Sequence, residues 1–118
     1  MKSLRKFTTI YLHRTAVDGR KMINGLAAIV EGEMGKSPMD GSLFVFTSRR
    51  RHTIRLLYWD KTGFALWTKK LEADRFRWPS KMEGETIALS PQQLRFLLDG
   101  YDIARMKPHA TLAYASAS

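Results

Sequence analysis

The sequence predicts an α+β fold in which a small antiparallel β-meander sheet packs against two amphipathic helices. Three runs rich in β-branched and aromatic residues follow one another at residues 43–46, 54–59 and 64–71, with only short turn segments between them. Two other segments, one before and one after these strands, repeat apolar residues at the spacing of a helix face. The 118 residues, of which 44% are hydrophobic, are enough for one domain with a single core.

The first helix is predicted over residues 20–34, after a short β-rich run at residues 8–13. We expect the carboxylate of Asp18 to cap the free amides of its first turn. Gly35 is expected to end the helix in a left-handed conformation. The apolar stripe of this helix consists of Ile23, Leu26, Ala27, Val30 and Met34.

The second helix carries the clearest boundary signals. Ser90, Pro91 and Gln93 fit the N-cap, the first helical position and the partner residue of a capping box. Gly100 is expected to end the helix, and the small residues of the tail, 107–118, to be loosely held within one domain of residues 1–118. The buried stripe consists of Leu94, Leu97, Leu98 and Tyr101.

Both faces of the predicted sheet are apolar near the turn at residues 60–63. If Trp59 pairs with Phe64, these two rings share one face, while Tyr58 and Trp67 lie on the other. Either the helices and terminal segments cover both faces in a compact monomer, or a second subunit or another protein covers part of them. Further short strands are predicted at residues 76–78 and 86–89.

Positive charge is concentrated in the middle of the chain. The protein has 20 Lys and Arg residues against 11 Asp and Glu residues, which gives a net charge of +9 and an isoelectric point near 10.2. Residues 47–81 hold ten of the basic residues and three of the acidic ones, so this segment carries seven of the nine excess charges. A localised excess favours a polyanion partner, DNA first and RNA second, over mere solubility.

The candidate nucleic-acid contacts follow from this distribution. Three consecutive arginines stand at a predicted hairpin turn, where a guanidinium can bind phosphate through two hydrogen bonds. Aromatic residues alternate with basic ones at residues 75–78, which suits stacking on unpaired bases, and Trp78 is the best candidate for an exposed ring. The candidates are Arg20, Lys21, Arg49, Arg50, Arg51, Arg55, Lys69, Lys70, Arg75 and Arg77.

Five motifs occur along the chain in a familiar order. They are D-G-R-K-M-I-N-G-L at residues 18–26, the block at 44–72, R-F-R-W-P at 75–79, the helix at 93–100 and M-K-P-H at 106–109. In this order they resemble the TnpB accessory proteins of the IS66 family of bacterial insertion sequences, over roughly residues 9–109. The resemblance implies a protein that is encoded beside a transposase and assists transposition, with the transposase as a possible partner.

No catalytic, metal or cofactor site is predicted. The acidic residues are scattered, and His13, His52 and His109 lack the spacing of metal ligands. The chain has no phosphate-cradling loop and no nucleophile motif. It also has no run of 18 apolar residues and no secretory signal, so we expect a cytoplasmic protein without a membrane span.

Two functions remain open at this point. The first is a non-catalytic accessory protein that binds DNA through a basic hairpin and strand surface. The alternative is an adaptor that docks on the transposase through an exposed apolar surface, for which Tyr58, Trp67 and Trp78 are the candidate residues. A homo-oligomer is compatible with either function.

Overall fold

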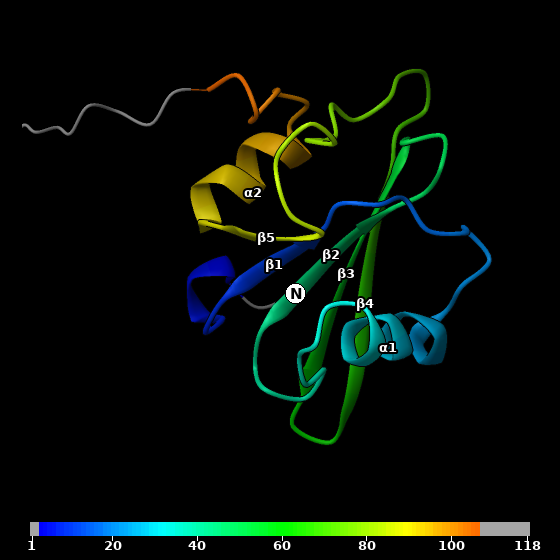
Figure 1. The fold of residues 1–118 in the computed structure, drawn as a ribbon, viewed down its shortest axis with the longest axis vertical. Coiled ribbons are helices and arrows are strands. Elements are labelled where there is room, and N and C mark those ends of the chain that lie inside the picture. The colour runs from blue at the N-terminus through cyan, green and yellow to red at the C-terminus, as the bar shows by residue number, and fades with distance from the viewer. Residues whose placement is uncertain (1–2, 107–118) are drawn as a thin grey trace, which may run out of the picture.

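The computed structural model describes residues 3–106, and a five-stranded mixed sheet forms its centre (Figure 1). The strand order is β4-β3-β2-β1-β5, and every neighbouring pair is antiparallel except β1 and β2. The α+β prediction is therefore confirmed, although the sheet is mixed. The strands are β1 (Ile10–His13), β2 (Leu43–Thr47), β3 (Thr53–Asp60), β4 (Gly63–Lys70) and β5 (Thr86–Leu89).

The parallel pairing of β1 with β2 results from the long connection between them. This connection contains α1 (Ile23–Gly32), and parallel neighbours need a crossover of this kind because a tight turn can join only antiparallel strands. By contrast, β3 and β4 form the predicted hairpin, with Trp59 opposite Phe64 and a tight turn in which Lys61 has a positive φ of 57°. A short 3₁₀ helix, η1 (Leu4–Lys6), precedes β1.

The two helices cover opposite faces of the sheet (Figure 1). The helix α2 (Pro91–Leu98) packs Leu94 and Leu97 against the face that carries Leu56. The helix α1 packs Leu26 and Val30 against the face that carries Leu57. Each face thus has a cover within the chain, as in the compact alternative, while the first residues of β4 stay only half-buried.

The boundary signals of α2 are confirmed. The Ser90 hydroxyl accepts a hydrogen bond from the Gln93 amide at 3.0 Å, and the Gln93 side chain accepts one from the Ser90 amide at 2.8 Å. Gly100 follows the helix with a φ of 97°, and Gly35 follows α1 with a φ of 64°. Tyr101 does not join the buried stripe, because 56% of its surface is exposed.

Two further local predictions are wrong. Asp18 does not cap α1, because the helix begins only at Ile23 and its N-cap residue, Met22, makes no side-chain cap. The Asp18 carboxylate instead accepts a hydrogen bond from the amide of Arg20, which precedes the first residue of α1. Residues 76–78 are extended but form no strand. The predicted tail, 107–118, lies outside the described residues, and within residues 3–106 no helix is long and apolar enough to cross a membrane.

Candidate nucleic-acid interface

The segment between β4 and β5, residues 71–85, crosses one end of the sheet beside the β2–β3 turn (Figure 1). Two backbone hydrogen bonds fix it there. The Leu71 amide donates to the His52 carbonyl at 2.8 Å, and the Phe76 amide donates to the Arg51 carbonyl at 2.6 Å. Two stretches of basic sequence that are separate along the chain therefore lie side by side.

Within this segment, buried rings alternate with exposed guanidinium groups. Phe76 and Trp78 are 3% and 6% exposed, whereas Arg75 and Arg77 point to solvent. An extended chain turns successive side chains to opposite sides, so the R-F-R-W sequence sends its rings inward and its cations outward. The expectation of an exposed ring at Trp78 is wrong, and stacking of this ring on a base is not possible in this arrangement.

The ring of Trp78 is an anchor. Its indole Nε1 donates a hydrogen bond to the carbonyl of Arg14 at 2.8 Å. The guanidinium of Arg14 in turn donates to the carbonyls of Ser80 at 3.0 Å and Gly84 at 2.9 Å. The stretch that follows β1 thus holds the segment from Trp78 to Gly84 in place.

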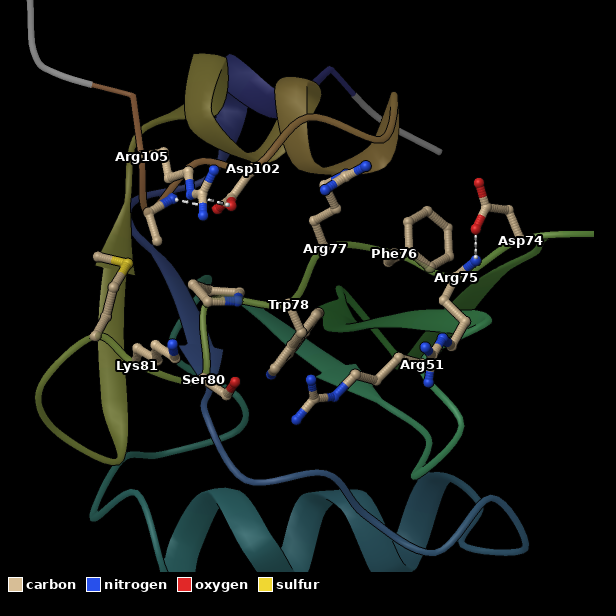
Figure 2. A pocket seen from close by; sticks show the side chains of 13 residues that line it. Arg51, Asp74, Arg75, Phe76, Arg77, Trp78, Ser80, Lys81, Asp102 and Arg105 are labelled. Atoms are coloured by element: carbon tan, nitrogen blue, oxygen red, sulfur yellow. Dashed lines mark hydrogen bonds and ion pairs between the residues drawn. The ribbon is translucent and has the colours of Figure 1, made fainter.

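An open pocket of about 650 Å³ lies between this segment, the β2–β3 turn and the stretch after α2 (Figure 2). Two carboxylates lie on its wall, and both already have partners. Asp74 accepts a hydrogen bond from the Arg75 amide at 2.7 Å, and Asp102 accepts one from the Ala104 amide at 3.2 Å. Five basic side chains line the same pocket: Arg51, Arg75, Arg77, Lys81 and Arg105.

Most of these cations have no internal counter-charge. Arg105 approaches Asp102, with Nε 3.6 Å from a carboxylate oxygen. Within residues 3–106, the side chains of the other four, Arg51, Arg75, Arg77 and Lys81, make no hydrogen bond and no ion pair. Sequence reasoning selected three of the five pocket cations and did not select Lys81 or Arg105.

Two predicted contacts, Arg55 and Lys69, make hydrogen bonds within the fold. The Arg55 guanidinium donates to the carbonyl of Lys21, and its other terminal nitrogen donates to the carbonyl of Gly19 at 2.6 Å. The Lys69 ammonium donates to the carbonyl of Leu98 at 2.9 Å, where a cation complements the C-terminal end of α2. Both groups are occupied by backbone oxygens of distant segments.

The remaining candidates lie towards the α1 face. The Arg20 guanidinium forms two hydrogen bonds with the Asp18 carboxylate, at 2.8 and 3.1 Å. These bonds, the amide of Arg20 and the nearby charge of Arg49 hold the pKa of Asp18 well below its usual range. Much of the charge of Arg20 is thus neutralised locally. Lys70 pairs with Thr53 across the hairpin and is exposed, as is Lys21.

The predicted basic residues therefore do not form one continuous face. Lys69 lies on the α2 face of the sheet, whereas Arg55 and Lys70 lie on the α1 face. Arg49 and Arg50 are exposed and lie in the turn that connects β2 and β3. We call the group formed by this turn and the pocket the basic end, and it comprises Arg49, Arg50, Arg51, Arg75, Arg77, Lys81 and Arg105.

The proposed partner-interface residues are mostly internal. Tyr58 is 7% exposed and packs edge-on against Phe7, with ring centroids 5.1 Å apart. Trp78 is buried as described above, so neither ring offers a docking surface. Trp67 is half-buried against the α2-side core. In the described part of the chain, no three His, Asp or Glu side chains gather in a way that could hold a metal ion.

These features define a small basic α+β protein whose uncompensated cations gather at one end of a mixed sheet. The chain matches the family described as IS66 Orf2-like protein over residues 8–108, and it belongs to that family. The resemblance found in the motifs is therefore confirmed. Membership gives the protein an accessory role associated with the transposition system of IS66-type insertion sequences.

Two relatives come from Sinorhizobium fredii (strain NBRC 101917 / NGR234). The uncharacterized protein y4jC is 37% identical over 91 residues, which cover 77% of this chain and 77% of the relative. The uncharacterized protein y4hO is 44% identical over 77 residues, which cover 65% of this chain and 66% of the relative. No solved structure matches the chain.

Proposed function

We propose that this protein assists IS66-type transposition as a non-catalytic DNA-binding factor, and that its basic end contacts the DNA backbone. One observation carries the proposal. Cations from the β2–β3 turn, from the segment after β4 and from the stretch after α2 meet around one pocket, and within residues 3–106 most of them have no acidic partner. Like charges held this close repel one another, and a polyanion would relieve that repulsion.

The DNA backbone is the polyanion that this group fits best. It carries one negative charge for about every 1.7 Å of duplex, and its phosphates accept paired hydrogen bonds from guanidinium groups. Six of the seven residues of the basic end are arginines. Arginine is the side chain best suited to such paired contacts with phosphate.

The test is DNA binding measured by fluorescence anisotropy at several salt concentrations. We expect the logarithm of the binding constant to fall linearly with the logarithm of salt, by about 0.9 for each phosphate contacted. The double variant Arg49→Ala/Arg50→Ala should bind more weakly and show a shallower salt dependence. Wild-type protein that binds no DNA at low salt would overturn the proposal.

A matched control removes the same charge elsewhere. Arg5 and Lys6 are exposed in η1, which precedes β1 at the end of the sheet opposite the β2–β3 turn. The double variant Arg5→Ala/Lys6→Ala should therefore retain most of the affinity. Equal losses in the two variants would assign DNA binding to net charge alone and remove the basic end from the proposal.

One observation supports the alternative function, an adaptor that docks on the transposase. Among the described residues, β4 pairs only with β3, so its other edge is unpaired over eight residues and can receive a strand from a partner. This function would predict retention of the transposase in a pull-down at high salt after nuclease treatment. Retention under these conditions, without DNA binding by the isolated protein, would favour the adaptor over the DNA-binding factor.

A further inference from the structure

We propose that the pocket of the basic end binds the terminal phosphate monoester of a nucleotide, supplied by the phosphorylated end of a single DNA strand. This inference rests on the proposed function, because it names the part of DNA that the pocket would take. It adds a specific contact to the general attraction between the protein and the backbone. The argument depends on the size, the charge and the lining of the pocket (Figure 2).

The size of the pocket suits a nucleotide and excludes a duplex. Its volume of about 650 Å³ lies within the range of about 300–1,000 Å³ that is usual for sites of small molecules. A double helix is far wider than such a hollow, since its major groove alone measures about 12 Å across. A duplex could contact only the rim, whereas the end of one strand could enter.

The charge of the pocket favours a doubly charged phosphate. Five cations face two carboxylates, and both carboxylates already accept hydrogen bonds from backbone amides. A phosphate within a strand carries one negative charge. A terminal phosphate monoester carries about 1.5 to 2 at neutral pH and offers three strong acceptor oxygens. The terminal group therefore gains more from this excess of positive charge.

The lining indicates recognition of phosphate and not of the base. Phe76 and Trp78 are the aromatic residues on the wall, and both are nearly fully buried. The indole N–H of Trp78 is already bonded to the Arg14 carbonyl. The groups that remain to bind a ligand are the side-chain cations without a partner among the described residues, on Arg51, Arg75, Arg77 and Lys81 (Figure 2). We therefore expect little preference among the four bases.

The backbone that carries these cations is held in place before a ligand arrives. The Arg51 carbonyl is bonded to the Phe76 amide, and Arg14 holds the carbonyls of Ser80 and Gly84. Arg77 and Lys81 lie on the backbone between these anchors. An anchored backbone lowers the entropic cost of binding, because only the side chains must still be ordered, so a group as small as one phosphate can contribute measurably.

The experiment compares two single strands of about twelve nucleotides that differ only in the presence of a 5′-phosphate, each labelled at its 3′ end. We expect the phosphorylated strand to bind the wild-type protein about tenfold more tightly, since charge-assisted bonds to phosphate are strong. In the double variant Arg77→Gln/Lys81→Gln this preference should disappear. In the control variant Arg5→Gln/Lys6→Gln it should persist, and circular dichroism should show that both variants are folded.

The outcomes separate this inference from the proposed function. Equal affinity of the wild type for the two strands, with steep salt dependence for both, would overturn the inference and leave DNA binding intact. A phosphate preference that survives in the Arg77→Gln/Lys81→Gln variant would also overturn it, because the phosphate would then bind elsewhere. A free deoxynucleoside monophosphate provides the third arm. If it binds through Arg77 while neither strand binds, the strand end and the proposed function both fail.

Discussion

The carbonyl oxygen of Arg51 accepts a hydrogen bond of 2.6 Å from the backbone amide of Phe76. This bond attaches the turn between β2 and β3 to the segment that follows β4. It places the Arg51 guanidinium on the same pocket as Arg75 and Arg77, the two neighbours of Phe76 in the chain (Figure 2). The basic end therefore depends on a backbone contact between two segments as well as on the charges themselves.

Replacing Arg51 by glycine should separate binding from stability. Arg51 and Lys61 have positive φ angles, 62° and 57°, which glycine adopts without strain. Both Arg51→Gly and Lys61→Gly should therefore change the free energy of unfolding by less than about 1 kcal/mol, as measured by urea denaturation. Only Arg51→Gly should weaken DNA binding, and the slope of its salt dependence should become shallower by about 0.9 for each phosphate that Arg51 neutralises in the wild type.

Lys61 is the matched control because it lies in the turn at the other end of the β3–β4 hairpin. Eight residues of β3 separate that turn from the β2–β3 turn, a distance of roughly 23 Å at the usual rise of a strand. Equal loss of DNA affinity in the two variants would show that Arg51 acts only through the net charge of the protein.

Local signals in the sequence were sufficient for several elements. The capping box of α2 joins Ser90 to a residue three positions later, and the β3–β4 hairpin depends on a tight turn flanked by Trp59 and Phe64. The parallel pairing of β1 with β2 could not be predicted in the same way. It depends on where the chain returns to the sheet after α1, and that position cannot be inferred from any short stretch of sequence.

The candidate site could also not be predicted fully from the sequence, because the partners of single side chains depend on tertiary contacts. In sequence, Arg55 and Lys69 resemble Arg51 and Arg77. They differ because Arg55 and Lys69 donate hydrogen bonds to the backbone carbonyls of Gly19 and Leu98. Only the tertiary structure brings these groups together. The inward direction of Trp78 likewise depends on a carbonyl 64 residues away in the sequence.

Replacing Trp78 by phenylalanine should loosen the segment that carries the cations. The substitution removes the indole N–H that donates to the Arg14 carbonyl and leaves a smaller ring in a buried position. We expect a loss of about 1–3 kcal/mol in the free energy of unfolding, from the unpaired carbonyl and the added cavity. DNA affinity should fall as well, because Arg77 and Lys81 lose a fixed backbone.

The control for Trp78 is Trp67→Phe, since Trp67 is half-buried and its indole makes no hydrogen bond within residues 3–106. This variant should lose less stability and keep its DNA affinity. Unfolding by urea and binding by anisotropy measure the two effects. If Trp78→Phe were as stable as the wild type, the indole bond would not anchor the segment.

Substitutions of Arg55 and Lys70 should differ in their effect on stability, although both are basic residues on the α1 face of the same hairpin. Arg55→Gln removes the donors to the carbonyls of Gly19 and Lys21, so it should lower stability by about 1 kcal/mol. Because Arg55 is occupied internally, its loss should change DNA affinity little. Lys70→Gln should leave stability unchanged, since Lys70 is exposed and makes no ion pair with another described residue.

The comparison of these two variants also tests whether the α1 face takes part in binding. Weaker DNA binding by Lys70→Gln would extend the contact surface beyond the basic end. Unchanged binding would confine it to the β2–β3 turn and the pocket. A large loss of affinity in Arg55→Gln, with unchanged stability, would contradict the structural role assigned to Arg55.

Glu85 should make the stability of the protein sensitive to acid. Burial raises the pKa of its carboxyl, but hydrogen bonds from the Thr15 amide and hydroxyl, at 2.8 and 2.7 Å, outweigh that effect. Electrostatic interactions with His13 and Arg14 also lower the pKa of Glu85, so its net shift is downwards. A carboxyl whose pKa is lower in the folded state stabilises the protein above its unfolded pKa, and this contribution is lost as the pH falls through the folded pKa.

Glu85→Gln should therefore destabilise the protein at about pH 7 and have a smaller effect at about pH 3, because the wild-type carboxyl becomes protonated as the pH falls through its folded pKa. Urea denaturation at both pH values measures the difference. Glu31→Gln is the control, because Glu31 is exposed on α1 and its substitution should change little at either pH. If Glu85→Gln costs the same stability at both pH values, the shape of the side chain and not its charge holds Thr15 in place.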